Sequence, residues 1–172
     1  LCYGGYHPVY IPTGEDAAVK EYLRMRDAHK LALKKLKQQI NAFVLRHGHL
    51  YTGTKWTIRH TTWLKKLELD PIYRETLDEY LASYEEQEAK IERYDKRIEE
   101  IAAEAHYQEN VKKLCCFLGI RTHTALSLIV ETGDFKRFAK GNTYAAYLGL
   151  VPGEHSSSTS VNRLGISKAG NT

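Results

Sequence analysis

The chain has 172 residues, of which 42% are hydrophobic, and it carries a formal net charge of +4 at neutral pH. This length holds one medium domain or two small ones and is enough to bury a core. The sequence has no apolar run of about 18 residues and no charged-then-apolar leader, so we expect a soluble, cytoplasmic protein without a membrane span. Its three cysteines and eight histidines lack the spacing of zinc ligands, so we expect reduced thiols and no metal site in this chain.

The charge is strongly segregated along the chain. Residues 20–66 contain 12 lysines and arginines against two acidic residues, whereas residues 68–109 contain 14 acidic residues against five basic ones. The basic segment favours a nucleic-acid partner, because phosphate contacts release counterions. Alternatively, the basic and acidic segments neutralise each other as packed helices, and both interpretations can hold on different faces.

The first helix is predicted from Thr13 to about His47. Residues 1–12 are rich in glycine and tyrosine and read as irregular or as one short strand. Thr13 is a helix-capping residue with Asp16 three positions later, and Gly48 is expected to end the helix. Within it, a 4-3 spacing marks one face: Tyr22, Arg26, His29, Leu33, Leu36, Ile40, Phe43 and His47.

A second long helix is predicted to begin at Asp70 and Pro71, after a short helix over residues 55–67. Proline after an N-cap residue is a strong helix start. A heptad pattern then runs through Tyr73, Leu77, Tyr80, Tyr84, Gln87, Ile91, Tyr94, Ile98, Ile101 and Ala105. We expect this acidic helix to fold antiparallel onto the basic one as a coiled coil, with further pairing between subunits into a homo-oligomer. Purely intramolecular packing is the alternative.

A compact helical unit is expected from Tyr107 onward. Residues 114–120 lead into a helix over residues 122–132, which Gly133 ends, and a last short helix covers residues 142–150, with Tyr144, Tyr147 and Leu148 packed inward. The predicted fold class is therefore mainly α, with a long antiparallel helical coiled coil followed by a small helical domain that has a helix-hairpin-helix-like unit.

The last 25 residues combine hydroxyl groups, glycines and cations. A run from Ser156 to Ser160 precedes Arg163 and Lys168, with glycines at positions 153, 165 and 170. Glycine lets backbone N–H groups approach an anion, the cations supply charge, and serine supplies a donor or a nucleophile. The segment therefore favours phosphate chemistry; a solvated loop near a chain end is the alternative.

Several segments resemble a family of insertion-sequence transposases. YLGLVP (147–152), EHSS (154–157) and GISKAGN (165–171) match its C-terminal motif, and LGI (118–120), TA (124–125), ETGDF (131–135) and RF (137–138) match a hairpin motif. The chain is identified as a member of the DEDD-type transposases, which are related to pilin-gene invertases and guided by a bridge RNA. The resemblance implies a tail over residues 1–14 after a resolvase-like domain that this chain lacks, a coiled-coil region over 15–106, and a truncated serine transposase domain over 107–172.

The resemblance also implies a catalytic serine for DNA strand transfer. It falls at Ser157, with Ser156 as second choice and with Arg163 and Lys168 as phosphate clamps. The glycine that normally follows the serine is Ser158 here. Mg²⁺ is expected only in the resolvase-like domain, which would hold it with four carboxylates, so this fragment should be inactive alone.

Nucleic-acid contacts are expected in two further places. The hairpin turn, with Gly119, Arg121 and Thr122, would hold a phosphate at a helix N-terminus, although Arg121 replaces the second glycine of such hairpins. The alternative is that the hairpin is simply the core of the C-terminal domain. The basic helix and loops would track the backbone of DNA and of a structured guide RNA through Lys34, Lys35, Lys55 and Arg59, with Lys30, Lys37, Arg46, Lys65 and Lys66 beside them. Two alternatives remain open: a catalytically inert nucleic-acid-binding module, and a coiled-coil dimerisation remnant.

Overall fold

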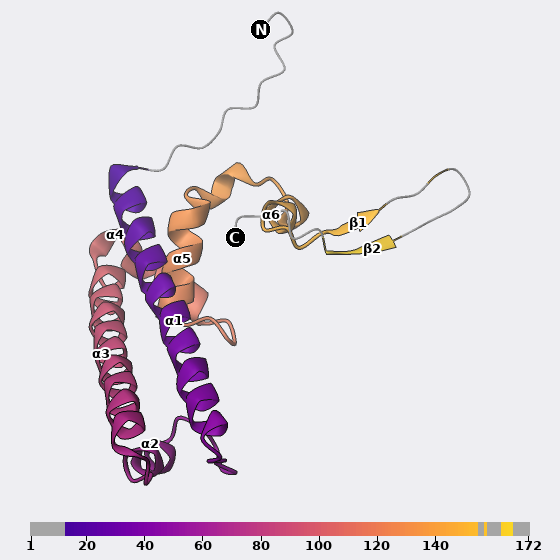
Figure 1. The fold of residues 1–172 in the computed structure, drawn as a ribbon. Helices are drawn as coiled ribbons and strands as arrows, with labels where there is room; N and C mark the ends of the chain where they lie inside the picture. Colours follow the sequence, from indigo (N-terminus) through magenta and orange to yellow (C-terminus); the bar gives the residue numbers. More distant parts are fainter. Residues whose placement is uncertain (1–12, 155–156, 158–162, 167–172) are drawn as a thin grey trace, which may run out of the picture.

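The computed structural model describes residues 13–154, 157 and 163–166, and it is mainly α-helical, as predicted (Figure 1). The expected strand or loop over residues 1–12 lies outside the described residues, as do Ser156 and Lys168. The elements in chain order are α1 (Gly14–Arg46), α2 (Ile58–Lys65), α3 (Pro71–Ala102), α4 (Ala105–Cys115), α5 (Thr122–Thr132), the 3-10 turn η1 (Phe135–Arg137), α6 (Gly141–Tyr147), β1 (Pro152–Glu154) and β2 (Arg163–Ile166).

Helix α1 begins and ends where its capping signals predict. The backbone N–H of Asp16 donates to Thr13 Oγ1 at 3.1 Å, which satisfies one of the free donors of the first turn. At the other end His47 is the C-cap, and Gly48 adopts a φ of +83°, a conformation that glycine takes without strain.

Helices α1 and α3 form the predicted antiparallel hairpin. Arg26, early in α1, pairs with Asp95 late in α3, whereas Phe43, late in α1, contacts Tyr73 and Tyr80 early in α3. Figure 1 shows the two helices side by side, with α2 at the end where they are joined. Five predicted seam residues are buried between them, namely Leu33, Ile40, Phe43, Leu77 and Tyr84, in a core that also contains Val44, Leu64 and Leu81, whereas the predicted seam residue Tyr73 is 42% exposed.

Helix α2 is shorter than the predicted segment 55–67. Thr57 caps it by accepting from the backbone N–H of His60 at 3.3 Å, so the helix starts at Ile58. The preceding residue, Trp56, lies in a turn with a φ of +63°, which is incompatible with a helix.

Helix α3 ends at Ala102, so the prediction that it continues to Ala105 is wrong. The chain bends there, α4 begins at Ala105, and Tyr107 becomes fully buried, with its hydroxyl donating to Asp16 Oδ1 at 2.8 Å. Asp16 is itself buried, because only 7% of it is exposed. A tertiary contact between α4 and α1 thus overrides the continuing heptad pattern.

The C-terminal unit forms a second core against the hairpin. Helices α4 and α5 pack on each other around a turn that contains Gly119 at a φ of +90°, and α5 ends at Gly133 with a φ of +65°, as predicted. This core joins the beginning of α1 and the end of α3 to α4 and α5 through Val19, Leu23, Ile98, Ile101, Ala102, Tyr107, Val111, Ala125, Leu126, Ile129 and Val130.

Helix α6 carries the predicted inward tyrosines. The hydroxyls of Tyr144 and Thr132 share a hydrogen bond of 3.0 Å, and the Tyr147 hydroxyl donates to the Glu131 carbonyl at 2.8 Å. The helix ends at Tyr147, before the predicted position 150, because Gly149 turns the chain at a φ of +69°. Strands β1 and β2 then pair antiparallel, with Glu154 opposite Arg163.

No helix among the described residues combines the length and the apolar character that crossing a bilayer requires.

Candidate nucleic-acid interface

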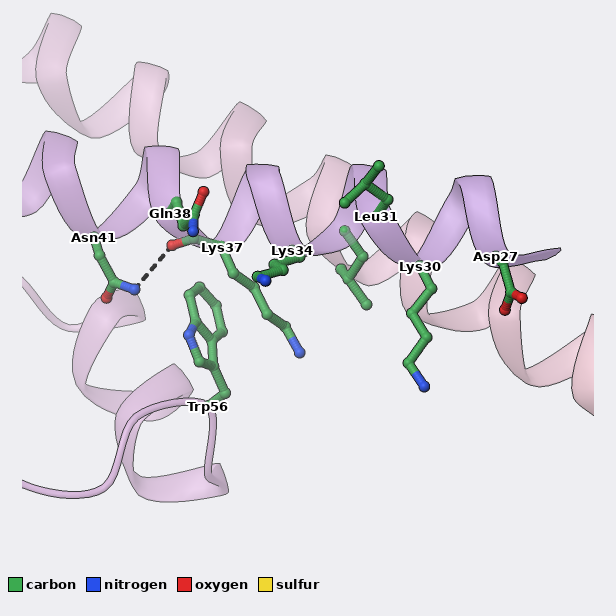
Figure 2. Close-up of a pocket in the computed structure, with 9 residues that line it drawn as sticks. Asp27, Lys30, Leu31, Lys34, Lys37, Gln38, Asn41 and Trp56 are labelled. Atoms are coloured by element: carbon green, nitrogen blue, oxygen red, sulfur yellow. Dashed lines mark hydrogen bonds between the residues drawn. The ribbon is translucent and has the colours of Figure 1, made fainter. Parts of the chain in front are cut away.

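The basic face of α1 borders a groove of about 660 Å³. Lys30, Lys34 and Lys37 reach into it from successive turns of α1, and the indole of Trp56 enters from the segment before α2 (Figure 2). The other residues that line it are Asp27, Leu31, Leu33, Gln38 and Asn41. Of the cations predicted to bind nucleic acid, Lys30, Lys34 and Lys37 therefore lie in the groove, whereas Lys35, Lys55 and Arg59 are exposed outside it.

The charge segregation is only partly neutralised within the hairpin. Three pairs join the basic segment to α3: Arg26 with Asp95, Lys37 with Glu88, and Lys65 with Glu85. Lys20 and Arg24 pair instead with Glu131 of α5. No carboxylate of a described residue lies within ion-pair distance of the other seven cations, which are Lys30, Lys34, Lys35, Arg46, Lys55, Arg59 and Lys66. Neutralisation by α3 is thus confirmed for three cations of the basic segment, and nucleic-acid binding by its exposed cations stays a prediction.

Trp56 is held in place by specific contacts. Its backbone N–H donates to Nδ1 of His60 at 3.1 Å, and its ring lies 5.0 Å from that of Tyr84. The Lys37 ammonium lies over the Trp56 ring at 5.3 Å and is itself bound to Glu88 at 3.2 Å. Trp56 is the one non-glycine residue in the described part of the chain with a positive φ, a conformation that needs such support.

His60 supports this turn as a neutral imidazole. Only 1% of the residue is exposed, and burial, with a smaller contribution from the charge of Lys55, lowers the pKa of His60 below its ordinary value. Because Nδ1 accepts the Trp56 N–H, the proton of the neutral ring is assigned to Nε2.

We expect the free energy of unfolding to fall as the pH drops below about 6.5, the ordinary pKa of histidine. In that range the unfolded chain binds a proton that folded His60 resists, so acid favours unfolding. Urea denaturation between about pH 5 and 7.5 measures this slope, and His60→Asn should reduce it. His49→Asn is the matched control, because it makes the same replacement at a histidine that is only half-buried. An equal slope in wild type and His60→Asn would contradict the assignment.

A second hollow, of about 590 Å³, lies where the hairpin meets the turn between α4 and α5. Arg121 and Thr122, two of the predicted phosphate-binding residues, line it together with His123 and Lys30, and Lys30 also borders the first groove. Gly119 lies in the turn but does not line the hollow. The structure thus brings the hairpin turn close to the basic helix, which no local pattern in the sequence indicates.

His123 is a site residue that the sequence did not single out. Its Nε2 lies 3.3 Å from Asp27 Oδ1, and burial is the main cause of a lowered pKa. The two residues are 96 positions apart in the chain, so only the fold could reveal the contact.

The predicted catalytic serine lies elsewhere. Ser157 is exposed, and Arg163 begins β2 in the ribbon that follows α6. Figure 1 shows strands β1 and β2 extending away from the α1–α3 hairpin, and Ser157 lines neither of the two hollows. In the described part of the chain, no three His, Cys, Asp or Glu side chains are grouped so that they could hold a metal ion.

The sequence is similar to transposases. Residues 109–172 match the model of the Transposase IS116/IS110/IS902 family. The transposase for insertion sequence element IS1533 of Leptospira borgpetersenii is 39% identical over 133 residues, which are 76% of this chain and 38% of that protein. The putative transposase y4qE of Sinorhizobium fredii is 31% identical over 170 residues, which are 95% of this chain and 39% of that protein. The chain thus spans about two fifths of the length of these proteins, and its residues 109–172 are similar to the IS116/IS110/IS902 family of transposases.

Proposed function

We propose that this chain is part of a transposase that binds DNA and that Ser157 supplies the nucleophile for strand transfer. The observation that carries the proposal is the family match over residues 109–172, which includes the exposed Ser157. The names of the relatives, transposases for insertion sequence elements, point to the same activity.

The proposed step is a transesterification at phosphorus. The Ser157 Oγ attacks a DNA phosphodiester, the new Oγ–P bond replaces one P–O bond to a sugar, and that sugar oxygen leaves with a proton. The serine proton passes to a general base that the complete protein supplies. Because a phosphoserine ester keeps the energy of the broken linkage, a second sugar hydroxyl can reverse the step at a new end without ATP. Nearby cations would stabilise the charge of the five-coordinate phosphorus, and Arg163 and Lys168 are the candidates.

The basic surface supports a nucleic-acid partner in this proposal. The exposed cations of α1, α2 and their connection would contact the phosphates of DNA, and a structured guide RNA would use the same kind of contact. Arg121 and Thr122, at the start of α5, would add a phosphate contact beside Lys30.

Covalent trapping tests the proposed nucleophile. The complete protein that contains this chain is incubated with labelled DNA that spans the junctions of its element, and protein–DNA adducts are separated under denaturing conditions. We expect an adduct with the wild type, none with Ser157→Ala, and an undiminished adduct with Ser83→Ala, a control serine on the exposed side of α3.

Two results would contradict the proposal. An adduct that persists in Ser157→Ala but disappears in Ser156→Ala moves the nucleophile to the neighbouring serine. No adduct with the complete protein under any condition would leave only nucleic-acid binding.

A further inference from the structure

We propose that the groove between α1 and Trp56 binds an unpaired stretch of DNA, with one base stacked on the indole and the flanking phosphates on Lys30 and Lys34. This inference rests on the proposed function for its DNA partner. It adds a binding site for a single strand, which the family match does not assign.

The chemistry of the groove suits a nucleotide. Its floor is apolar, because Leu31, Leu33, the Trp56 ring and the aliphatic stems of the lysines supply most of it, and its rim carries ammonium groups (Figure 2). A nucleotide has the complementary layout, an aromatic base beside a negative phosphate. Single-strand binding surfaces combine a cationic track with an aromatic ring in this way.

The contacts around Trp56 explain how its strained backbone conformation is maintained. A positive φ at a bulky residue is unfavourable by roughly 1–3 kcal/mol and persists only where the surroundings hold it. Here the His60 hydrogen bond and the Tyr84 ring hold Trp56, with Lys37 braced over it by Glu88. The result is an aromatic ring fixed beside the lysines, which lowers the entropy lost when a base stacks on it.

The two free cations of the rim are spaced for phosphates of one strand. Lys30 and Lys34 are four residues apart on α1, about 6 Å along the helix axis, which is about two nucleotide steps in a stacked strand. Lys30 and Lys34 are exposed and form no ion pair with a described residue. The one carboxylate on the lining, Asp27, is already paired with Arg26 at 3.0 Å.

The occupant is an unpaired DNA strand for two physical reasons. In a duplex both faces of a base are already stacked, so Trp56 could bind only a base that has left the stack. RNA would bring a 2′-hydroxyl against the largely apolar floor, which is unfavourable unless the hydroxyl finds a hydrogen bond. The acidic helix α3 of a second copy would also satisfy the lysines, but three of its four tyrosines are buried or half-buried, which leaves only the ring of Tyr73 exposed for Trp56.

Fluorescence anisotropy with a labelled oligo(dT) of about 12 nucleotides tests the inference on the 172-residue chain. We expect Trp56→Leu to weaken binding by about 5- to 100-fold, and Trp56→Phe to keep most of it, because base stacking is lost only in the first. Lys34→Ala should lower the slope of log K against log salt by about 0.7, the value for one phosphate of a single strand. Lys96→Ala, which removes an exposed lysine paired with Glu92 on α3, is the charge-matched control and should leave the affinity within about twofold.

Three results would overturn the inference. Equal affinity of Trp56→Leu and wild type, with both folded by circular dichroism, excludes the stacking site. Binding of duplex DNA or oligo(U) as tight as that of oligo(dT) excludes an unpaired DNA strand as the occupant. If the chain self-associates and both Trp56→Leu and Lys34→Ala abolish this, the groove receives a second copy. The binding assay measures no strand transfer, so it is independent of the covalent-adduct assay. Trp56-dependent binding without any covalent adduct would refute Ser157 as the nucleophile but not the groove. A Ser157-dependent adduct without Trp56-dependent binding would refute the groove but not the nucleophile.

Discussion

Replacing Leu126 with alanine is expected to lower the free energy of unfolding by about 3 kcal/mol, within the range of roughly 2–5 kcal/mol for buried leucines. Leu126 is fully buried in α5, in the core that joins both ends of the hairpin to the C-terminal unit. The truncation removes apolar contacts and leaves a cavity between α1, α3, α4 and α5, which would have to move together to close it. Urea denaturation followed by far-UV circular dichroism measures the change, and a thermal midpoint lower by roughly 6–12 °C should accompany it.

Leu118→Ala is the matched control for this prediction. Leu118 is also a leucine of the C-terminal unit, but it lies fully exposed in the turn between α4 and α5. Its replacement should change the free energy of unfolding by less than about 0.5 kcal/mol. If both variants lowered the free energy of unfolding equally, Leu126 would not be buried in the core formed by α1, α3, α4 and α5.

The long helices could be predicted because their signals are local. Thr13 and Pro71 are start signals in the sequence itself, and an apolar spacing of three and four residues shows which face of each helix is buried. The seam positions Ile40 and Leu77 are fully buried, as this spacing indicates. The segregated charge also indicated the pairing of α1 with α3, because opposite charges on two amphipathic helices favour their contact.

The groove could be predicted only in part. The lysines of α1 are visible in the sequence as a basic segment, but their aromatic partner is not, because a positive φ is typical of glycine or asparagine and nothing in the sequence marks Trp56 for it. The burial of His60 could not be predicted either, since the sequence around a lone histidine does not show whether its side chain is exposed or buried. The contact of His123 with Asp27 depends on the packing of the C-terminal unit against α1.

The end of α3 shows why a local pattern can mislead. The heptad pattern continues to Ala105, yet the helix stops at Ala102. Asp16 accepts the hydroxyl of Tyr107, which is 91 residues away, so a residue that looks like a plain capping position also joins α1 to α4. No spacing rule links two such positions.

Tyr107→Phe is therefore expected to lower the free energy of unfolding by about 2 kcal/mol. The variant keeps the buried ring and removes the hydroxyl that donates to Asp16 Oδ1 at 2.8 Å, and hydrogen bonds to charged groups contribute roughly 1.5–3 kcal/mol. The remaining carboxylate is only 7% exposed and loses its closest donor side chain. Urea denaturation at neutral pH measures the loss, and a double-mutant cycle with Asp16→Ala isolates the coupling between the two side chains.

Alkaline pH provides a second readout of the same contact. Burial, followed by the hydrogen bond to Asp16, raises the pKa of Tyr107 above its ordinary value of 10.0. The folded state then holds a proton that the unfolded chain releases, so stability should fall as the pH rises above about 10. Tyr107→Phe should flatten this fall but not remove it, because burial also raises the pKa of Tyr84. Tyr73→Phe is the control, since Tyr73 is 42% exposed and its hydroxyl bonds to no described residue. Two results would show that the contact between Tyr107 and Asp16 does not join α4 to α1. One is that Tyr73→Phe lowers the free energy of unfolding as much as Tyr107→Phe, and the other is a negligible coupling energy between Tyr107 and Asp16.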